Sequence, residues 1–286
     1  GGVVTALSAA KQYAKLTWIS SAMREGDRQA AERVHGGKFK APPLECNLDL
    51  RFVVSHRNVY HKYYNIFCNP LLWFLQHYMW NSSRTPNVDG VIYDAWENGY
   101  KAVNRAFAQA VVDEAKEHDP PPLVMLQDYH LYLAAGYIRD EMPHLTLQHF
   151  THIPWPSVSY WQLLPDSMRK EIHCGLCAND IVGLQAKRDV HNFLHCCESF
   201  IDGAEVDYRE PTVWVNGHRT LVKAYPISVD TAHLEKMCSS TAVREYEMKL
   251  DPLCGEQTIV RVDRVEPSKN IVRGFRAFDI LLRRHP

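Results

Sequence analysis

The sequence predicts an α/β fold built from parallel β-α-β units. Short apolar runs of strand character alternate with longer segments of helical periodicity along most of the chain, an order that favours a parallel sheet over a sandwich or a helical bundle. Each predicted strand is followed by polar residues before the next helical segment. Because open parallel sheets bind ligands at the carboxyl ends of their strands, these polar residues are the first candidates for a site.

The predicted elements follow from these two patterns. Strands are expected at residues 123–127, 146–151, 180–184, 221–225 and 258–262. Helices are expected at residues 3–13, 69–80, 93–117, 131–141, 165–177, 188–197, 231–249 and 267–284. Residues 36–47 and 81–90 carry neither pattern, whereas residues 205–219 predict a hairpin whose turn is Asn216-Gly217.

A domain boundary is predicted between residues 229 and 230. A charged helical stretch follows Asp230, then the polar segment 251–257, and then a new strand. The sequence has no initiator Met, and it stops directly after a helical pattern. We therefore expect a fragment that holds most of one domain, residues 1–229, and the beginning of a second, residues 230–286.

Composition narrows the class of protein. The 286 residues include 32 basic and 33 acidic side chains, and without a basic tail or charge block no nucleic-acid partner is expected. No apolar run approaches the roughly 18 residues that span a bilayer, and no signal peptide opens the chain, so a cytoplasmic protein without a membrane partner is expected. Eight cysteines are too sparse for a disulfide scaffold. The sequence leaves the oligomeric state open, and a homo-oligomer is one of the alternatives.

Two polar residues follow successive predicted strands. Asp128 lies in QDYHL, directly after residues 123–127, and His152 lies in THIPWPS, a loop whose prolines on either side of Trp155 restrict the backbone. If the two strands are neighbours, Asp128 and His152 lie side by side. The competing interpretations are that Asp128 only caps the following helix and that His152 is a core residue.

Aromatic residues mark a second candidate region. Tyr64 and Trp73 lie in YYNIFCNPLLW, where the pattern fits core packing or the wall of a sugar site, because aromatic faces stack on sugar rings. Gly1-Gly2 opens the sequence and fits the end of a glycine-rich, phosphate-contacting loop. Two glycines alone carry little information.

Arg264 and Lys269 mark a third candidate region. They lie in RVDRVEPSKN, between a predicted strand and a predicted helix whose first turn suits Pro267. Two cations beside the amino terminus of a helix favour a diphosphate, since the exposed N–H groups and the side chains both attract negative charge. A solvated loop without a ligand is the competing interpretation.

A metal site is not expected. The candidate ligands are His173, Cys174, Cys177, His191, His195, Cys196 and Cys197. Two of the cysteines fall within a predicted helix without the turn of a zinc knuckle, and the adjacent pair does not easily reach one ion.

Together, the motifs resemble a known family. GGVVTAL, YYNIFCNPLLW, WENGYKAVNRAFA, QDYH, THIPWPS, DIVGLQAKRDVHNFL and RVDRVEPSKN, in this order, are similar to the trehalose-6-phosphate synthase family of retaining glycosyltransferases. The resemblance implies two Rossmann-like domains with the active site in the cleft between them. Residues 1–229 would be the acceptor-binding domain without its first strand, and residues 230–286 the truncated start of the donor-binding domain. It also implies no metal ion or other cofactor.

The resemblance also implies a role for each candidate. Acceptor-binding positions match Tyr64, Trp73 and Asp128; donor-side positions match Gly2, His152, Arg264 and Lys269. Glucose would pass from a nucleotide sugar, UDP-glucose by preference, to glucose 6-phosphate, giving trehalose 6-phosphate and UDP. In the front-face reaction favoured for such enzymes, Arg264 and Lys269 would stabilise the leaving diphosphate while Asp128 and His152 orient the sugars.

Departures from the family leave alternatives open. Gln127 replaces a usual histidine, Ser21 a second tryptophan and Ser228 a common glycine, which puts the acceptor or donor in doubt. TWISSA, HIPWPSVSYW and PSKN also resemble the validoxylamine phosphate synthases, pseudoglycosyltransferases that couple cyclitols. An inactive regulatory member is the third alternative. The donor base stays open among uracil, guanine and adenine, because its pocket is expected beyond residue 286.

Overall fold

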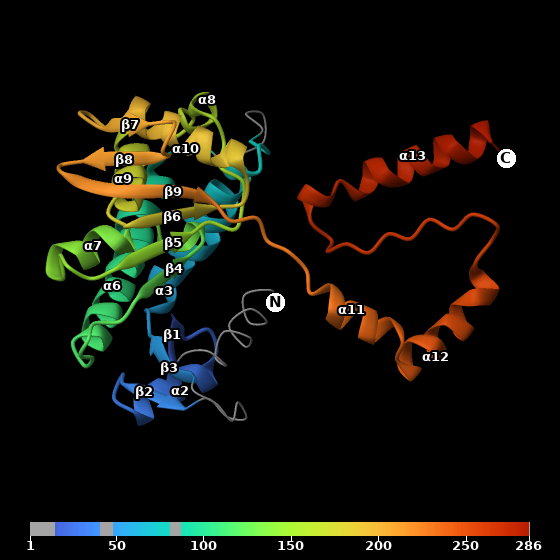
Figure 1. Cartoon of the computed structure of the whole chain (residues 1–286), viewed down its shortest axis with the longest axis horizontal. Helices are drawn as coiled ribbons and strands as arrows, with labels where there is room; N and C mark the ends of the chain where they lie inside the picture. Colours follow the sequence, from blue (N-terminus) through green and yellow to red (C-terminus); the bar gives the residue numbers. More distant parts are fainter. Residues whose placement is uncertain (1–14, 41–47, 81–86, 286) are drawn as a thin grey trace. The chain divides into compact units, whose positions relative to one another are not determined.

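The protein divides into two compact units in a computed structural model that describes residues 15–40, 48–80 and 87–285. The first unit ends at Pro226 and the second begins at Ile227, and Figure 1 shows the elements of each. The predicted helix at residues 3–13 and the candidate Gly2 lie outside the described residues. The acceptor and donor roles assigned to the two domains stay predictions.

The larger sheet of the first unit confirms the predicted α/β class. Its six strands run in the order β4-β5-β6-β9-β8-β7. Four are mutually parallel, namely β4 (Val124–Gln127), β5 (Leu147–Phe150), β6 (Ile181–Leu184) and β9 (His218–Ala224). The antiparallel edge consists of β8 (Thr212–Val215) and β7 (Glu205–Asp207). The turn from β8 to β9 is at Asn216 and Gly217, as predicted, and both have positive φ, 50° and 80°, as a two-residue hairpin turn requires.

A smaller sheet was not predicted. It pairs β1 (Leu16–Ser21) in parallel with β3 (Leu48–Val53), while β2 (Lys38–Lys40) is antiparallel to β3. The expectation of irregular structure at residues 36–47 is therefore wrong for β2. These strands are hard to find because β1 mixes apolar with hydroxyl side chains and β2 and β3 mix apolar with charged ones, and because the paired strands β1 and β3 lie far apart in the sequence. Between β1 and β2 lies α2 (Glu25–Arg33).

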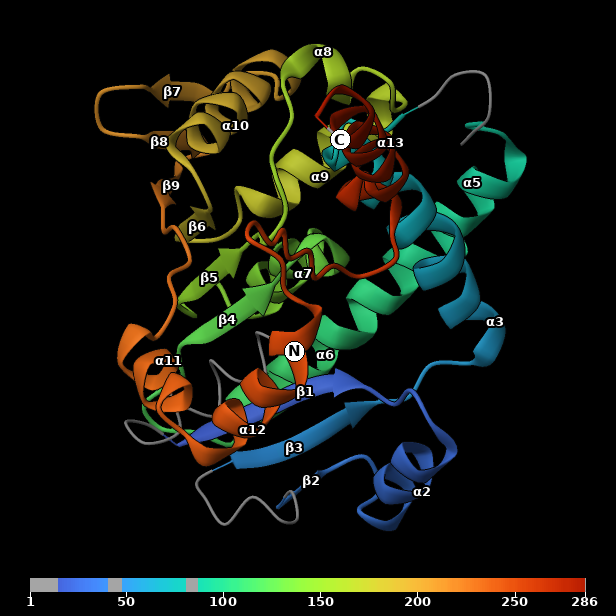
Figure 2. The ribbon, with the colours of Figure 1, turned by 90° about the vertical axis from the view of Figure 1, so that its right-hand side faces the viewer.

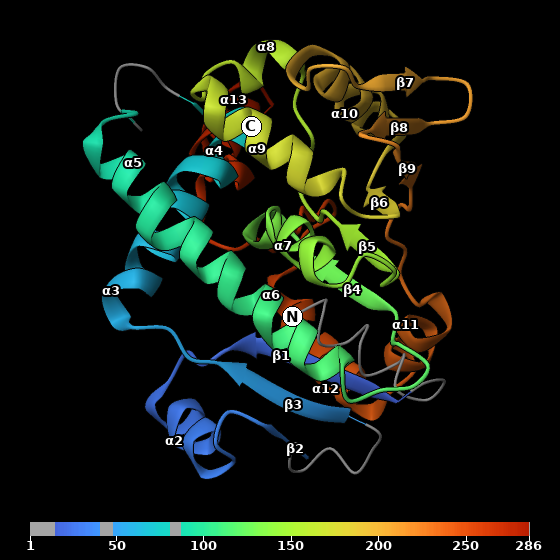
Figure 3. The same ribbon diagram turned by 90° about the vertical axis from the view of Figure 1, so that its left-hand side faces the viewer.

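Helices cover the two sheets of the first unit. In Figure 3, α6 (Ala102–Ala115), α7 (Ala134–Glu141) and α9 (Asp166–Leu176) lie on one face. Helix α8 (Val158–Trp161) lies beside α10 (Lys187–Phe200), and α10 packs on β6 and β9. The core is aromatic, with Trp96, Trp155, Trp161 and Tyr100 fully or almost fully buried.

Two helices contain π-helical segments. One runs from α3 (Arg57–Tyr60) through η1 (His61–Trp73), which includes Pro70, to α4 (Phe74–Gln76). The other runs from α5 (Gly90–Ala95) through η2 (Trp96–Lys101) into α6. The first helix begins well before the predicted residue 69. The prediction is wrong here because a proline in a sequence usually marks a helix boundary. Such π-helical turns are often found at functional sites.

The second unit corrects two predictions. Residues 258–262 are extended, but they form no strand, because nothing in the described part of this unit pairs with them and Ile259 and Val260 stay exposed. The predicted helix 231–249 is two helices, α11 (Thr231–Cys238) and α12 (Thr241–Leu250), and the Ser240 hydroxyl caps the second. The 3₁₀ turns Asp251–Leu253 and Pro267–Lys269 and helix α13 (Ile271–Arg284) complete the unit.

None of the described helices meets the length and apolarity that a membrane span requires.

Candidate active site

Asp128 and His152 meet where two neighbouring strands end. Because β4 and β5 are paired in parallel, the backbone N–H of His152 reaches Oδ1 of Asp128 at 3.1 Å. Asp128 has a left-handed backbone, with φ at 66°, and its own N–H donates to the carbonyl of Phe150 at 2.7 Å. Such strain costs about 1–3 kcal/mol and is often kept at functional sites. The predicted juxtaposition of these two residues is confirmed.

The carboxylate of Asp128 is poorly solvated. Burial raises its pKa, whereas the neighbouring His152 ring and the backbone N–H groups of His152 and Tyr129 act in the opposite direction. His77 adds a further interaction that lowers the pKa. A carboxylate with little water around it accepts hydrogen bonds from a ligand hydroxyl strongly, since the interaction is less screened.

Gln127 fixes the ring of His152. The imidazole Nε2 donates to Oε1 of Gln127 at 2.9 Å, so in the neutral ring Nδ1 is left as an acceptor. Phe150 meets the ring edge-on, with centroids 4.8 Å apart. The sequence marked Gln127 only as a departure from the family. Its bond to His152 shows that it positions a predicted site residue.

The turn that carries Asp128 is held by buried side chains that the sequence analysis missed. The Tyr100 hydroxyl donates to the carbonyl of Tyr129 at 2.7 Å, and the Asn104 amide donates to the carbonyl of His130 at 3.1 Å. Asn104 also accepts from the backbone N–H of Leu133 at 3.1 Å. Their one signal was a polar pair at i, i+4 spacing, which places both side chains on one face of the predicted helix.

Tyr64 lies over the same turn. Its ring stacks on that of His130 with centroids 5.6 Å apart and planes 12° from parallel. Burial lowers the pKa of His130 to about 4, so this imidazole is neutral at pH 7. Its Nε2 is buried without a hydrogen-bond partner among the residues that the structure describes. Tyr64 is therefore close to Asp128, as an acceptor-binding role requires.

Trp73 approaches Asp128 through His77. The two rings lie 4.2 Å apart, and Nδ1 of His77 is 2.7 Å from the carbonyl of Trp73. His77 in turn affects the pKa of Asp128. The candidates Tyr64, Trp73, Asp128 and His152 thus form one connected group in the first unit.

The loop after His152 is rigid. The N–H of Trp155 donates to Asp189 at 3.2 Å, and its carbonyl accepts from Asn192 at 2.9 Å. The N–H of Ser157 donates to the Tyr78 hydroxyl at 3.1 Å. With Trp155 fully buried, the loop holds His152 in place before any ligand arrives.

Arg264 and Lys269 lie in the second unit, where they converge on Glu266. Nη2 of Arg264 lies 3.2 Å, and Nζ of Lys269 3.6 Å, from the same oxygen, Oε1. The hydroxyl of Ser268, with the two cations, lowers the pKa of Glu266. The helix prediction needs a correction: Pro267 opens a separate 3₁₀ turn and α13 begins at Ile271, since Asn270 has a left-handed φ of 54°.

Among the described residues, no cluster of three or more His, Cys, Asp or Glu side chains has the arrangement to hold a metal ion. The two closest cysteines are Cys177 and Cys197, whose Sγ atoms lie 3.6 Å apart in the core. Burial raises the pKa of the Cys197 thiol, which makes it a packing residue and a poor thiolate.

Comparison with known proteins gives the family. The model of glycosyltransferase family 20 matches residues 1–286. The chain belongs to glycosyltransferase family 20. It is 29% identical over 296 residues to the UDP-forming α,α-trehalose-phosphate synthase of Yarrowia lipolytica, covering all of this chain and 58% of that protein. It is 26% identical over 283 residues to the validamine 7-phosphate valienyltransferase of Streptomyces hygroscopicus subsp. jinggangensis, covering 99% of this chain and 56% of that protein.

Solved structures share the fold. An Escherichia coli structure bound with UDP-2-fluoro glucose has a TM-score of 0.78 at 22% identity, covering all of this chain and 59% of its own. A trehalose-phosphate synthase from Burkholderia xenovorans in complex with glucose-6-phosphate has a TM-score of 0.67 at 22% identity, covering 88% of this chain and 52% of its own. This family member thus spans somewhat more than half the length of the relatives it matches.

Proposed function

We propose that this family 20 chain is part of a retaining glycosyltransferase that moves glucose from UDP-glucose to glucose 6-phosphate, giving trehalose 6-phosphate and UDP. The observation that carries the proposal is the meeting of Asp128 and His152 at the carboxyl ends of β4 and β5, with the Tyr64 ring over the same turn. This group offers a desolvated carboxylate, an oriented imidazole and an aromatic face, which suit a sugar.

In the proposed reaction, Asp128 accepts hydrogen bonds from the acceptor hydroxyls, and Tyr64 and Trp73 bound the acceptor. His152 contacts the donor glucose and holds it facing the attacking hydroxyl. Because both sugars are held in this orientation before the bond breaks, their proximity increases the rate of the reaction.

The leaving diphosphate is assigned to Arg264 and Lys269, with Gly2 as a further donor-side residue. In the structure both cations contact one carboxylate oxygen of Glu266, which supports their ability to act on a single anion. They would stabilise the charge that develops on the diphosphate, where preorganised charge lowers the barrier most. The two cations supply the positive charge locally, so the proposal includes no metal cofactor.

Valienyl transfer to validamine 7-phosphate is the second candidate. The Streptomyces relative that carries this name is 26% identical, close to the 29% of the trehalose-phosphate synthase from Yarrowia. The structural feature that favours it is Gln127, which contacts His152 through an amide where the synthase family usually has histidine. An inactive regulatory member is the remaining alternative.

One assay separates the three. The full-length protein that contains this chain is mixed with a nucleotide sugar and an acceptor phosphate, and release of the nucleoside diphosphate is measured with glucose 6-phosphate or validamine 7-phosphate as acceptor. We expect release with UDP-glucose and glucose 6-phosphate. Faster release with the cyclitol acceptor validamine 7-phosphate would favour the second candidate. No release with any donor and acceptor would contradict the transferase proposal.

A variant tests the donor assignment. Lys269→Ala should weaken UDP-glucose binding about tenfold or more, because a charge-assisted contact to the diphosphate is lost, and should leave acceptor binding nearly unchanged. Lys236→Ala is the matched control, since Lys236 is an exposed lysine of α11 in the same unit. Equal donor affinity in Lys269→Ala and wild type would remove Lys269 from the site.

A further inference from the structure

Helix α10 exposes a row of side chains that carry metal-binding atoms. His191 and His195 lie four residues apart, Glu198 lies three residues further, and all three are exposed. At about 100° per residue, these positions fall within a sector of about 60° on the helix surface. Other positions of the helix, among them Phe193 and Cys197, are fully buried. Because the core holds the helix through them, the exposed row has a fixed backbone.

The two imidazoles are close enough to bind one ion. Their ring centroids lie 6.5 Å apart, and their planes are tilted by 44°. Two imidazoles on one tetrahedral ion, with metal–nitrogen distances of about 2.0–2.1 Å, have centroids about 5 Å apart. Small rotations of two exposed side chains close the remaining distance without any movement of the backbone. Two histidines at this spacing on one face of a helix are also how the H-E-x-x-H motif binds zinc.

Tyr208 restrains the row from a second element. It lies in the turn between β7 and β8, and Figure 2 shows these strands beside α10. Its ring contacts that of His191, with centroids 5.5 Å apart, and its hydroxyl donates to Oε2 of Glu198 at 2.8 Å. The turn itself is fixed, because Oδ1 of Asp207 accepts from the backbone N–H of Arg209 at 2.7 Å. These contacts order the row before an ion binds.

The donor atoms select the class of ion. Imidazole nitrogen suits Zn²⁺, Cu²⁺ and Ni²⁺, whereas Mg²⁺ and Ca²⁺ take oxygen ligands. Because both imidazoles belong to one helix, the second binds as an intramolecular ligand and raises the affinity about a hundredfold over that of a single histidine. The pair therefore favours a divalent transition-metal ion.

Glu198 supplies the negative charge of the row. Its carboxylate is held on this face of α10 by the Tyr208 hydroxyl and can accept a hydrogen bond from water on the ion. Such outer partners strengthen metal binding. Lys187 lies one turn before His191 and is exposed, so its positive charge opposes a cation. The carboxylate of Glu198 offsets that charge.

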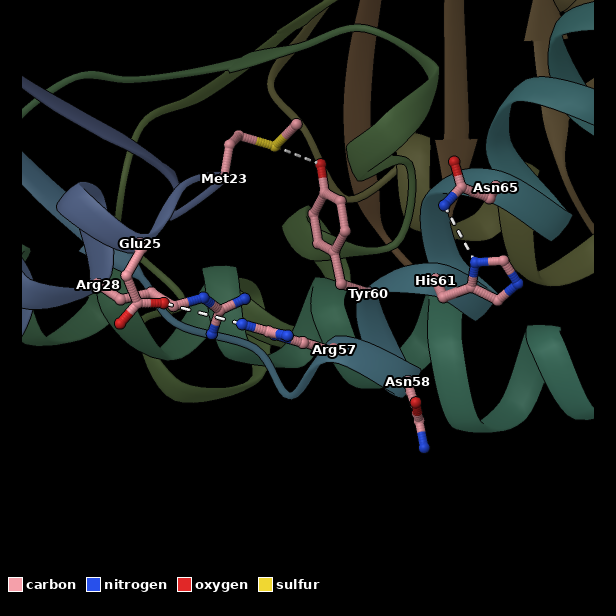
Figure 4. A pocket seen from close by; sticks show the side chains of 8 residues that line it. All are labelled: Met23, Glu25, Arg28, Arg57, Asn58, Tyr60, His61 and Asn65. Atoms are coloured by element: carbon pink, nitrogen blue, oxygen red, sulfur yellow. Dashed lines mark hydrogen bonds and ion pairs between the residues drawn. The ribbon is translucent and has the colours of Figure 1, made fainter.

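A second pair at the same spacing provides a comparison. His61 and Asn65 lie four residues apart in η1, on the wall of a pocket of about 500 Å³ that is drawn in Figure 4. The two side chains point toward one another, and Nδ2 of Asn65 lies 3.1 Å from Nδ1 of His61. An amide nitrogen is a hydrogen-bond donor and supplies no lone pair to a metal. This pair therefore represents a single exposed imidazole.

We propose that His191 and His195 bind a divalent transition-metal ion on the surface of the first unit, with water completing its coordination and Glu198 hydrogen-bonded to that water. A site with two protein ligands agrees with the lack of any suitable cluster of three among the described residues. The sequence analysis considered these histidines only together with cysteines, of which Cys196 and Cys197 are buried. The site is independent of the proposed transfer reaction, which includes no metal.

The test measures Ni²⁺ binding by calorimetry on the full-length protein that contains this chain. Ni²⁺ is the probe because thiolates favour Zn²⁺ and Cys238 and Cys254 are exposed. We expect His195→Gln to weaken Ni²⁺ binding about a hundredfold, since the chelate is lost. Glutamine is at least as good a helix former as histidine, so the helix is kept. No Ni²⁺ binding to wild type, or equal affinity in His195→Gln, would overturn the proposal.

The matched control is His61→Gln, which removes one exposed imidazole without a second histidine at i+4. Its Ni²⁺ affinity should stay within twofold of wild type, and a loss equal to that of His195→Gln would show unspecific binding to histidines and overturn the site. Mg²⁺ in excess should not compete with Ni²⁺. Competition by Mg²⁺ would show that charge alone attracts the ion, and it would also overturn the proposal.

Two further measurements locate the ion. Because Ni²⁺ is paramagnetic, it should broaden the ring proton NMR signals of His191 and His195 before those of other histidines. Glu198→Gln should weaken Ni²⁺ binding about tenfold, the effect of losing an outer partner. Earlier broadening of other histidine signals would place the ion elsewhere and contradict the assignment.

Discussion

The backbone N–H of His152 donates to Oδ1 of Asp128 at 3.1 Å, and burial raises the pKa of that carboxyl group. A raised pKa means that the folded protein binds the proton more tightly than the unfolded chain does. The stabilisation is then complete below the ordinary value of 3.8 and is lost as pH rises through the higher folded pKa. At pH 7 the charged carboxylate therefore destabilises the fold.

Asp128→Asn should accordingly raise the unfolding temperature at pH 7, since the amide keeps an acceptor for His152 and removes the charge. Calorimetry across pH should show the gain shrink toward pH 3.8, the ordinary pKa. If Asp128 orients the acceptor, sugar binding falls in the same variant. Asp140→Asn, at an exposed position of α7, is the control and should change the free energy of unfolding by less than about 0.5 kcal/mol. A lower unfolding temperature for Asp128→Asn would contradict the prediction.

Glu114 gives a stability prediction of the opposite sign. It is a buried residue of α6 and lies 2.6 Å from Nζ of Lys38 and 3.0 Å from the Thr17 hydroxyl. Burial raises its pKa, but hydrogen bonds from Lys38, His118 and Thr17 outweigh burial and lower the pKa to about 2. The carboxylate therefore stabilises the smaller sheet against α6 above pH 4.5, and this stabilisation is lost as pH falls from 4.5 to about 2.

Glu114→Gln should lower the free energy of unfolding in urea by about 3 kcal/mol at pH 7, because it breaks a buried ion pair. The difference from wild type should vanish near pH 2. Glu117→Gln is the matched control: Glu117 also contacts Lys38, at 3.0 Å, but is 55% exposed, so its loss should cost less than about 1 kcal/mol. A pH-independent deficit in Glu114→Gln would point to packing rather than charge.

The sequence predicts the larger sheet well and the smaller sheet not at all, for a physical reason. β4, β5 and β6 are short strands of mainly apolar residues, each followed by a helix along the chain, so each is visible as a local apolar run. No residue of β1 is fully buried and in β3 only the two end residues are, and the pairing that makes them strands joins residues about 30 positions apart. Local patterns do not record such a partner.

Residues 258–262 show the opposite failure. Their apolar, β-branched sequence favours a strand, yet the described part of the second unit provides no partner strand, and the segment is extended without a ladder. For the candidate site, the sequence identified Asp128 and His152 through strand order. It missed Gln127, Tyr100 and Asn104 as positioning residues because hydrogen bonds to a distant turn leave little trace in the sequence.

Tyr100 is predicted to hold the Asp128 turn. Its hydroxyl donates to the carbonyl of Tyr129 at 2.7 Å and accepts from the N–H of Tyr132 at 3.2 Å, and the side chain is fully buried. Tyr100→Phe leaves both backbone groups unpaired, so the free energy of unfolding should fall by about 1–3 kcal/mol. Tyr208→Phe is the control, because that hydroxyl bonds Glu198 at an exposed position and should cost less than about 0.5 kcal/mol. Equal losses in the two variants would contradict the assignment.

Gly99 is predicted to set the contact between the two π-helical segments. A Cβ at this position would lie 2.7 Å from both the Cβ of Lys62 and the backbone nitrogen of Tyr63, so neither neighbour can move without shifting η1. Because Tyr64 belongs to the same segment, Gly99→Ala should disturb its stacking on His130. We expect a loss of about 1–3 kcal/mol in the free energy of unfolding, the usual cost of overpacking, together with weaker acceptor binding.

The control for this prediction is Gly136→Ala in α7. A Cβ there would approach nothing closer than the Cα of Gly175 at 3.9 Å, an ordinary contact. The substitution should therefore stabilise the protein by up to about 1 kcal/mol, since alanine favours a helix over glycine. Urea unfolding of both variants tests whether Gly99→Ala lowers and Gly136→Ala raises the free energy of unfolding. If Gly99→Ala were as stable as Gly136→Ala, the close approach of η1 and η2 would not constrain the position of Tyr64.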